Sequence, residues 1–282
     1  MKKHLSTIII LLMFLVGLSV LLYPAISAYI NSKHASRVVA SYQDTVDNAG
    51  EERIAEFFEG AYDYNRRLAA DPSAFYIPSR LSGYWQTLDI TGTGIMGSIS
   101  IEKLNVELPI YHGTDAGVLQ IGAGHIEGTS LPVGGEGTHC VLSGHRGLPS
   151  AKLFTDLDKL EIGDTFVISV LDRDLTYRID QIKTVLPTES EDLLPVKGKD
   201  YCTLVTCTPY GINTHRLLVR GVYEETPEAK PGIRVRNEAF RIDPLIVAPI
   251  AAIPMVLLLI ISTFIRSGKK KKDDDTSDKT HK

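Results

Sequence analysis

The residues best suited to chemistry lie around one cysteine, in the stretch "TLVTCTPYGINTHRLLVRG" that runs from Thr203 to Gly221. Cys207 ends a run of β-branched residues and Pro209 stops that run, so the thiol is expected at the rim of a strand. A tight turn and a returning strand would bring His215 or Arg216 beside it. A nearby cation favours the thiolate form of a cysteine, and a cysteine–histidine pair is the usual minimum for thiol nucleophilic catalysis.

The register of this hairpin decides which basic residue faces Cys207. Symmetrical closure around the five-residue turn "PYGIN", with the second strand at 214–223, pairs Cys207 with His215. A one-residue bulge puts Arg216 there instead. His145 is a second candidate base, because it follows the apolar strand of "HCVLSGHRG" with glycines on both sides. The residues alone leave the choice between His145 and His215 open.

Burial as a small apolar residue is the alternative for any cysteine. Cys140 and Cys202 lie inside apolar strand-like runs, so core packing is expected for both. Three cysteines do not make a disulfide framework for a chain of this size. His112, His125 and His139 fit no zinc-binding spacing, so we expect no metal at these histidines.

Two apolar segments flank these motifs. Residues 5–30 and 244–265 contain no charged side chain, and each is long enough to cross a hydrocarbon core of about 30 Å as a helix. The first is longer than the apolar part of a cleaved signal peptide. Lys2 and Lys3 precede it, and Lys269–Lys272 follow the second segment. The positive-inside rule therefore predicts a multi-pass protein of the cell membrane, with both termini cytoplasmic and the intervening region extracellular.

The intervening region changes from a helical to a strand pattern. Residues 33–70 have apolar side chains at three- and four-residue spacing, with a break at Gly50 and a stop at Asp71–Pro72. Residues 73–94 predict a long loop with at most one short helix. From residue 95 to 223, seven or eight short strands with one short helix predict a closed β-barrel or a sandwich. The net charge of −4 gives no broad basic field, so we expect no nucleic-acid partner.

Taken together, the motifs resemble the sortase family, the cysteine transpeptidases of Gram-positive cell surfaces. "LSGHRG", "TLVTC" and an arginine nine residues after that cysteine occur in the expected order, and the likeness covers residues 95–223. The resemblance implies a mainly β, sortase-type closed barrel of about eight strands. It also implies that His145, Cys207 and Arg216 form the catalytic set, with Arg216 facing Cys207. The implied reaction cleaves an LPXTG-like sorting signal through a thioester and needs no cofactor.

Helices before the barrel, spans at both ends and an extended loop are similar to class C sortases, which polymerise pilins. That resemblance implies a lid with Asp-Pro followed by an aromatic residue. Asp71 and Pro72 match, Ser73 departs from the pattern, and Phe75 is the substitute ring. On this interpretation Asp71 pairs with Arg216, although Asp71–Pro72 is equally a helix stop.

In a pilin polymerase the acceptor is a lysine of another pilin subunit. The expected partners are therefore pilin or surface proteins bearing the sorting signal, together with the lipid bilayer. Cell-wall attachment of surface proteins, hydrolysis by a cysteine protease and a non-catalytic pilus-assembly adaptor are the alternatives. The expected organisation is a cytoplasmic tip and transmembrane helix at 1–31, extracellular helices and a lid-like loop at 32–94, the catalytic barrel at 95–225, a juxtamembrane linker at 226–243, a transmembrane helix at 244–265 and a basic then acidic cytoplasmic tail at 266–282.

Overall fold

The computed structural model describes residues 2–225, with side chains from residue 13 onward. The predicted linker, second transmembrane helix and tail lie outside the described residues. The first element, α1 (Lys2–Asp47), is one continuous helix that passes through the predicted boundary at residue 31. Residues up to Ile26 and residues from Ser27 onward belong to different compact units. Within the described chain, one helix stretch, Met13–Asp47, has the length and apolar composition needed to cross a membrane.

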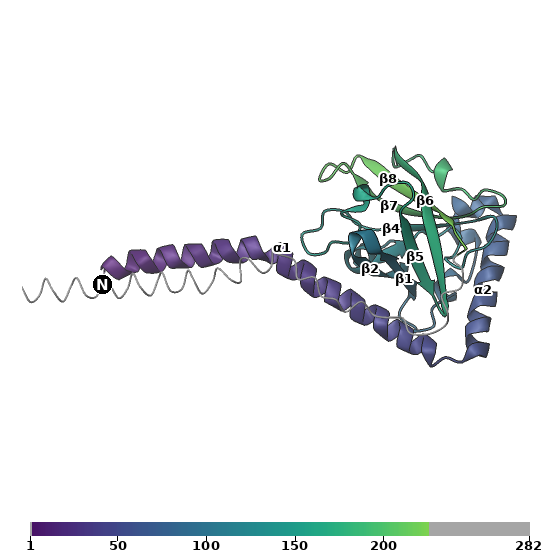
Figure 1. Ribbon diagram of the computed structural model, residues 1–282, viewed down its shortest axis with the longest axis horizontal. Helices are drawn as coiled ribbons and strands as arrows, with labels where there is room; N and C mark the ends of the chain where they lie inside the picture. The colour runs from purple at the N-terminus through teal and green to yellow at the C-terminus, as the bar shows by residue number, and fades with distance from the viewer. Residues whose placement is uncertain (1, 226–282) are drawn as a thin grey trace, which may run out of the picture. The chain divides into compact units, whose positions relative to one another are not determined.

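The second half of α1 packs beside the barrel (Figure 1), and one of its buried side chains, Tyr42, bonds to the backbone there. The hydroxyl of Tyr42 donates to the carbonyl of Met96 at 3.0 Å and accepts from the amide of Leu171 at 2.8 Å. Both polar partners are buried, so breaking this link would leave a desolvated amide and carbonyl unpaired. The bonds of Tyr42 therefore help to hold α1 in one position along its axis against the barrel.

The predicted break between two helices is confirmed. Gly50 has a φ of 77°, a left-handed conformation that glycine adopts without strain, and α2 (Glu51–Ala70) begins after it. The next segment differs from the expected loop with at most one helix, because three short 3₁₀ helices cover it. These helices are η1 (Pro72–Phe75), η2 (Pro78–Arg80) and η3 (Tyr84–Gln86). Pro72 and Pro78 each stand at a first helical position, where the missing amide costs nothing.

Eight strands close into a barrel in the order β1-β2-β3-β4-β7-β8-β6-β5. This confirms the barrel over the sandwich. The β2–β3 and β4–β7 pairs are parallel and the other pairs are antiparallel. The strands are β1 (Ile95–Ile101), β2 (Val106–His112), β3 (Ala123–His125), β4 (Thr138–Ser143), β5 (Thr165–Val170), β6 (Arg173–Val185), β7 (Asp200–Thr208) and β8 (His215–Tyr223).

Short helices connect some of these strands, and the sequence pattern missed part of them. It predicted neither the three-residue strand β3 nor the helix before it. The single helix expected in this region is a 3₁₀ turn between β4 and β5. The helices are η4 (Glu102–Leu104), α3 (Ala116–Ile121), η5 (Leu157–Lys159) and η6 (Glu191–Leu193).

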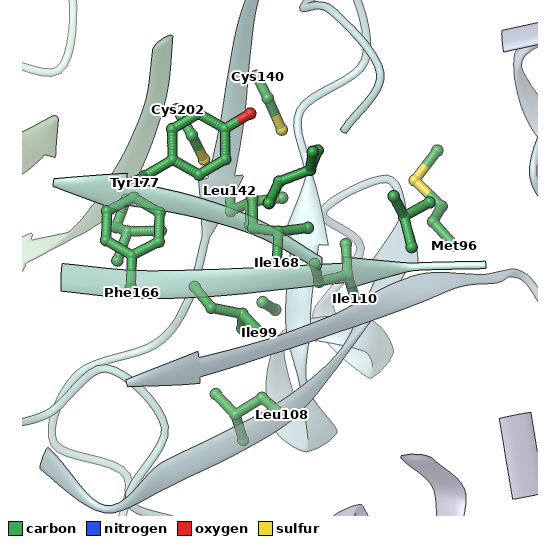
Figure 2. Close-up of a cluster of buried hydrophobic side chains, with 14 of the residues drawn as sticks. Met96, Ile99, Leu108, Ile110, Cys140, Leu142, Phe166, Ile168, Tyr177 and Cys202 are labelled. Carbon is green, nitrogen blue, oxygen red and sulfur yellow. The ribbon is translucent and has the colours of Figure 1, made fainter. Parts of the chain in front are cut away.

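The barrel interior is filled by apolar side chains from successive strands (Figure 2). Cys140 on β4 and Cys202 on β7 are register partners in this core, 2% and 0% exposed. The prediction that both cysteines are core residues is therefore confirmed. Burial raises the pKa of the Cys202 thiol well above its usual range, which keeps that sulfur neutral.

Candidate active site

The hairpin of β7 and β8 brings Cys207 opposite Arg216. Symmetrical closure onto His215 is wrong, because His215 pairs with Thr208. The turn therefore spans residues 209–214, one residue more than "PYGIN", and β8 starts at His215 and not at residue 214. Successive residues of a strand point to opposite faces, so His215 faces away from Cys207.

The face that carries Cys207 is the outer face of the barrel. Leu204 and Val219 are register partners inside the core, whereas Val205 and Leu218 pair in a separate cluster outside it. Cys207 shares the face of Val205, two residues earlier. The outer cluster consists of Val141, Val205 and Leu218, with Ile126, Val185 and Leu193 packed against it.

His145 lies just beyond the end of β4, which runs parallel to β7. Ser143 pairs with Val205, and the next residue, Gly144, donates its amide to the Val205 carbonyl at 3.0 Å. The Thr206 hydroxyl then donates to the Gly144 carbonyl at 2.8 Å, so contact between the chains continues past the strand end. His145 follows Gly144 directly, so it stands just past this end of β4, beside the end of β7 that carries Cys207.

All three of these residues are partly buried, in contrast to the two core cysteines. The guanidinium of Arg216 donates from Nη1 to the carbonyls of Asn213 and His215, at 3.3 and 3.1 Å. Within residues 2–225 it forms no ion pair. Its charge is therefore not neutralised by a carboxylate and is available to an anion on the outer face.

Glycines let the histidine turn come close to its neighbours. A Cβ on Gly144 would lie 2.5 Å from the Phe154 ring, and one on Gly147, whose φ is 78°, would lie 2.9 Å from the Tyr210 ring. The sequence expectation that glycines admit close approach beside His145 is confirmed. Only glycine fits both positions without displacing an aromatic ring.

Arg146 is a site residue that the sequence reasoning missed. Its side chain is 9% exposed, and Nη1 donates to the Thr208 hydroxyl at 3.2 Å, one residue from Cys207. It also forms an ion pair with Asp158 and lies over the Tyr210 ring, 6.0 Å from its centroid. Arg146 thus ties the histidine turn to the end of the cysteine strand. The sequence signal that could have identified Arg146 is its position between the candidate catalytic His145 and Gly147.

In the lid-like segment, Asp71 contacts other residues than the expected partner, Arg216. The carboxylate of Asp71 pairs with Arg80 at 2.7 Å and accepts bonds from the amide and hydroxyl of Ser73. The expected pairing of Asp71 with Arg216 is therefore wrong, because Ser73 and Arg80 lie close in sequence and occupy the carboxylate. These bonds hold the pKa of Asp71 below its usual value. Asp71 also caps η1, which agrees with the helix-stop interpretation.

Phe75 and Pro72 stand in η1, which lies over the β3–β4 connection. A Cβ on Gly128 would lie 2.8 Å from the Phe75 carbonyl and 3.0 Å from that of Ala74. The Phe75 ring makes an edge contact with Tyr76, with centroids 4.9 Å apart. Ile126, two residues before Gly128, belongs to the outer cluster that includes Val205. The segment therefore lies beside the apolar part of the Cys207 face.

The other histidines weighed for metal binding are buried and bonded to the backbone. His112 contacts the carbonyls of Gly94 and Thr87, and His125 contacts that of Ser130. His139 contacts the Leu194 carbonyl. In the part of the chain that the structure describes, no group of three or more metal-ligating side chains is gathered. A pocket of about 510 Å³ is lined by Asp200 and Arg173, at the opposite end of β7 from Cys207.

The geometry of these residues defines a class of site. A partly exposed thiol stands at a strand rim, with an uncompensated guanidinium on one neighbouring strand and an imidazole beyond the other. Such an arrangement suits thiol-based acyl transfer, which needs a nucleophile, a proton carrier and an oxyanion donor.

Comparisons with known proteins agree with this class. A family model described as the sortase domain matches residues 99–224. Sortase D of Bacillus subtilis (strain 168) is 34% identical over 114 residues, which is 40% of this chain and 54% of that protein. The chain thus spans about half the length of that curated relative.

Solved structures cover more of the chain. The crystal structure of sortase C1 from Streptococcus agalactiae has a TM-score of 0.62 and 48% identity, covering 67% of this chain and 99% of that one. The structure of Clostridium perfringens sortase C "with the C-terminal cell wall sorting motif" has a TM-score of 0.59 and 42% identity, covering 68% of this chain and 100% of that one. The chain belongs to the sortase family, whose members are cysteine transpeptidases, and these structural neighbours are class C sortases.

Proposed function

We propose that this chain is a membrane-anchored cysteine transpeptidase with Cys207 as its nucleophile, His145 as its proton carrier and Arg216 as its oxyanion donor. The observation that carries the proposal is the pairing of Cys207 with Arg216 on the outer face, next to the strand that leads into His145. Membership in the sortase family supports the reaction class.

The first half-reaction forms a thioester. The Cys207 thiolate attacks the carbonyl carbon of the Thr–Gly bond in an LPXTG-like signal, and the Arg216 guanidinium donates to the oxyanion that develops. Protonated His145 gives its proton to the leaving glycine amine as the C–N bond breaks. A charged donor aimed at an oxyanion typically lowers the activation free energy of the rate-limiting step by a few kcal/mol.

The second half-reaction transfers the acyl group to an amine. The incoming amine attacks the thioester carbonyl and loses a proton to neutral His145, and the Cys207 thiolate leaves. The enzyme thereby returns to its starting protonation state, so no cofactor enters the balance. Splitting the reaction at a thioester lets an amine compete with water.

We propose that the substrates are pilins bearing the sorting signal and that the acceptor is a lysine of another pilin subunit. The class C neighbours support this assignment, and one of them is described with a cell wall sorting motif. The lid-like segment with Asp71, Pro72 and Phe75 is proposed to regulate access, because it lies beside the outer cluster that continues toward Cys207.

Membrane anchoring is proposed through α1, with both termini cytoplasmic and the barrel on the outer face. Met13, Val20 and Leu21 on this helix are 70%, 70% and 72% exposed, which suits lipid surroundings and would be costly in water. Labelling of intact cells with a membrane-impermeant maleimide tests the orientation. Modification of Cys207 only after the cells are opened would contradict it.

The function is tested by the masses of the products. The full chain in detergent is mixed with a sorting-signal peptide and a lysine-bearing pilin, and an amide-linked product that Cys207→Ala does not form is expected. Free acid as the sole product, despite abundant amine, would indicate a hydrolytic protease. No turnover with intact binding would indicate an adaptor. Preference for a short cell-wall peptide amine over pilin lysine would indicate cell-wall attachment.

A further inference from the structure

Three contacts along α1 show which part of the barrel lies nearest the apolar segment. The amide of Asn31 donates to the Ser150 carbonyl at 2.7 Å, and the hydroxyl of Ser36 donates to Glu107 at 3.2 Å. Tyr42 contacts Met96. At a rise of about 1.5 Å per residue, the second and third contacts lie about 8 and about 16 Å further along the helix than the first. Of the three contacted parts of the barrel, the loop that holds Ser150 is therefore the one closest to the apolar N-terminal segment of α1.

Asn31 is the first residue after the uncharged apolar run that ends at Ile30, and α1 is helical through both. Tyr29 and Ile30 are 42% and 58% exposed. If α1 crosses the membrane, as proposed above, the helix leaves the hydrocarbon near these residues. The Ser150 loop then stands at the level where the helix leaves the bilayer.

The loop between β7 and β8 lies against the same turn. Gly147, three residues before Ser150, approaches the Tyr210 ring so closely that a Cβ there would lie 2.9 Å from it. Tyr210 is 60% exposed and Ile212, near the tip of the loop, is 68% exposed. Figure 1 shows this loop projecting from the barrel beyond β8. Two large apolar side chains thus stand in the open at the end of the barrel that α1 reaches first.

We propose that Tyr210 and Ile212 dip into the interface of the phospholipid bilayer, as a second membrane contact beside the α1 span. Tyrosine suits the headgroup level, because its ring is apolar and its hydroxyl remains hydrated, and isoleucine suits the acyl chains beneath. Arg37, exposed on α1 beyond Asn31, suits the headgroups. The contact would hold Cys207, three residues from Tyr210, close to the membrane surface, within reach of a sorting signal held in the same bilayer.

This inference rests on the proposed membrane anchoring, and fluorescence tests it. The full chain contains one tryptophan, Trp85, which is 49% exposed. In a Trp85→Phe background, checked by peptide turnover, the Ile212→Trp variant is reconstituted in phosphatidylcholine–phosphatidylglycerol vesicles with brominated acyl chains. We expect strong quenching and a blue-shifted emission. The matched control is Tyr223→Trp, since Tyr223 is 39% exposed at the opposite end of β8.

The outcomes separate the inference from the proposals beneath it. Quenching of the Ile212→Trp variant several-fold above that of the Tyr223→Trp variant supports the contact. Equal, weak quenching in chains that float with the vesicles overturns it and leaves the anchoring intact. A blue shift that depends on protein concentration and not on bromine assigns the loop to a second copy of the chain and also overturns it. Failure to float overturns both the contact and the anchoring.

An activity comparison gives a second test. The Ile212→Asp variant is expected to process a soluble sorting-signal peptide like the unmodified chain, but to act several-fold more slowly on the same signal held in the vesicle by a lipid tail. The contact would be overturned if the Ile212→Asp variant and the unmodified chain processed the lipid-held substrate at the same rate. Loss of peptide turnover in the unmodified chain would overturn the proposed function instead.

Discussion

Mild acid is expected to destabilise the barrel through His139, which links β4 to the connection between β6 and β7. Nδ1 of His139 lies 3.0 Å from the Leu194 carbonyl, and Nε2 lies 2.7 Å from the Thr203 hydroxyl. The side chain is buried, and this burial lowers the pKa of His139 from 6.5 to about 4. The unfolded chain therefore binds a proton at a pH where the folded chain does not.

The size of the effect follows from the two pKa values. The stabilisation from this group is fully present above pH 6.5 and is lost as the pH falls from 6.5 to about 4. The free energy of unfolding is expected to fall by about 2 kcal/mol between pH 7 and pH 5, and by about 3 kcal/mol in total. Burial also lowers the pKa of His112, so that residue acts in the same direction.

Urea unfolding of the full chain in detergent, followed by the fluorescence of Trp85, measures this effect. The His139→Gln variant is expected to be less stable at pH 7 but to lose about 2 kcal/mol less than the unmodified chain on acidification. His34→Gln, on the exposed side of α1, is the matched control and should keep the full acid loss. If His139→Gln and the unmodified chain lose the same free energy between pH 7 and pH 5, the assignment to His139 is refuted.

Three further substitutions test the site. Arg216→Met should lower kcat by about 10² to 10³ with a smaller change in KM, because it removes an oxyanion donor. Arg220→Met, on the same face of β8 but ion-paired with Asp180 at 2.9 Å, should leave kcat nearly unchanged, and equal losses would contradict the role of Arg216. Gly144→Ala should destabilise the chain by about 1–3 kcal/mol in urea unfolding, because the Cβ would lie 2.5 Å from Phe154. Gly60→Ala, where a Cβ meets nothing within 4 Å, should be neutral or stabilising, and a similar loss there would contradict the packing argument. Arg146→Met should lower kcat and shift its pH profile, with partial rescue by Arg146→Lys; a change in stability alone would limit Arg146 to folding.

Local patterns were sufficient to predict most of the fold. Short runs rich in Val, Ile, Thr, Tyr and Leu, separated by turn residues, identified seven of the eight strands, and the three- and four-residue spacing identified α2 with its start after Gly50. Pairing with β2 and β4 holds the strand β3 in place. This strand was not predicted, because three residues are too few to show a strand pattern. The short 3₁₀ helices of the lid-like segment escaped for the same reason.

The site was predictable only in part. The face of Cys207 followed from strand alternation, but the hairpin register did not, because one more residue in the turn changes its partner from His215 to Arg216. The position of His145 depends on parallel pairing between β4 and β7, which are more than fifty residues apart in sequence. The ion pair of Asp71 with Arg80 depends on the path of the 3₁₀ segment, which no residue pattern specifies.

The most direct measurement is to identify the residue that carries the acyl group during turnover. The full chain is mixed with a sorting-signal peptide, quenched in acid within the first turnover, digested and mapped by mass spectrometry. We predict a thioester on the fragment that contains Cys207, with Cys140 and Cys202 unmodified. A thioester on either buried cysteine, or product formation without any adduct on Cys207, would contradict the proposed mechanism.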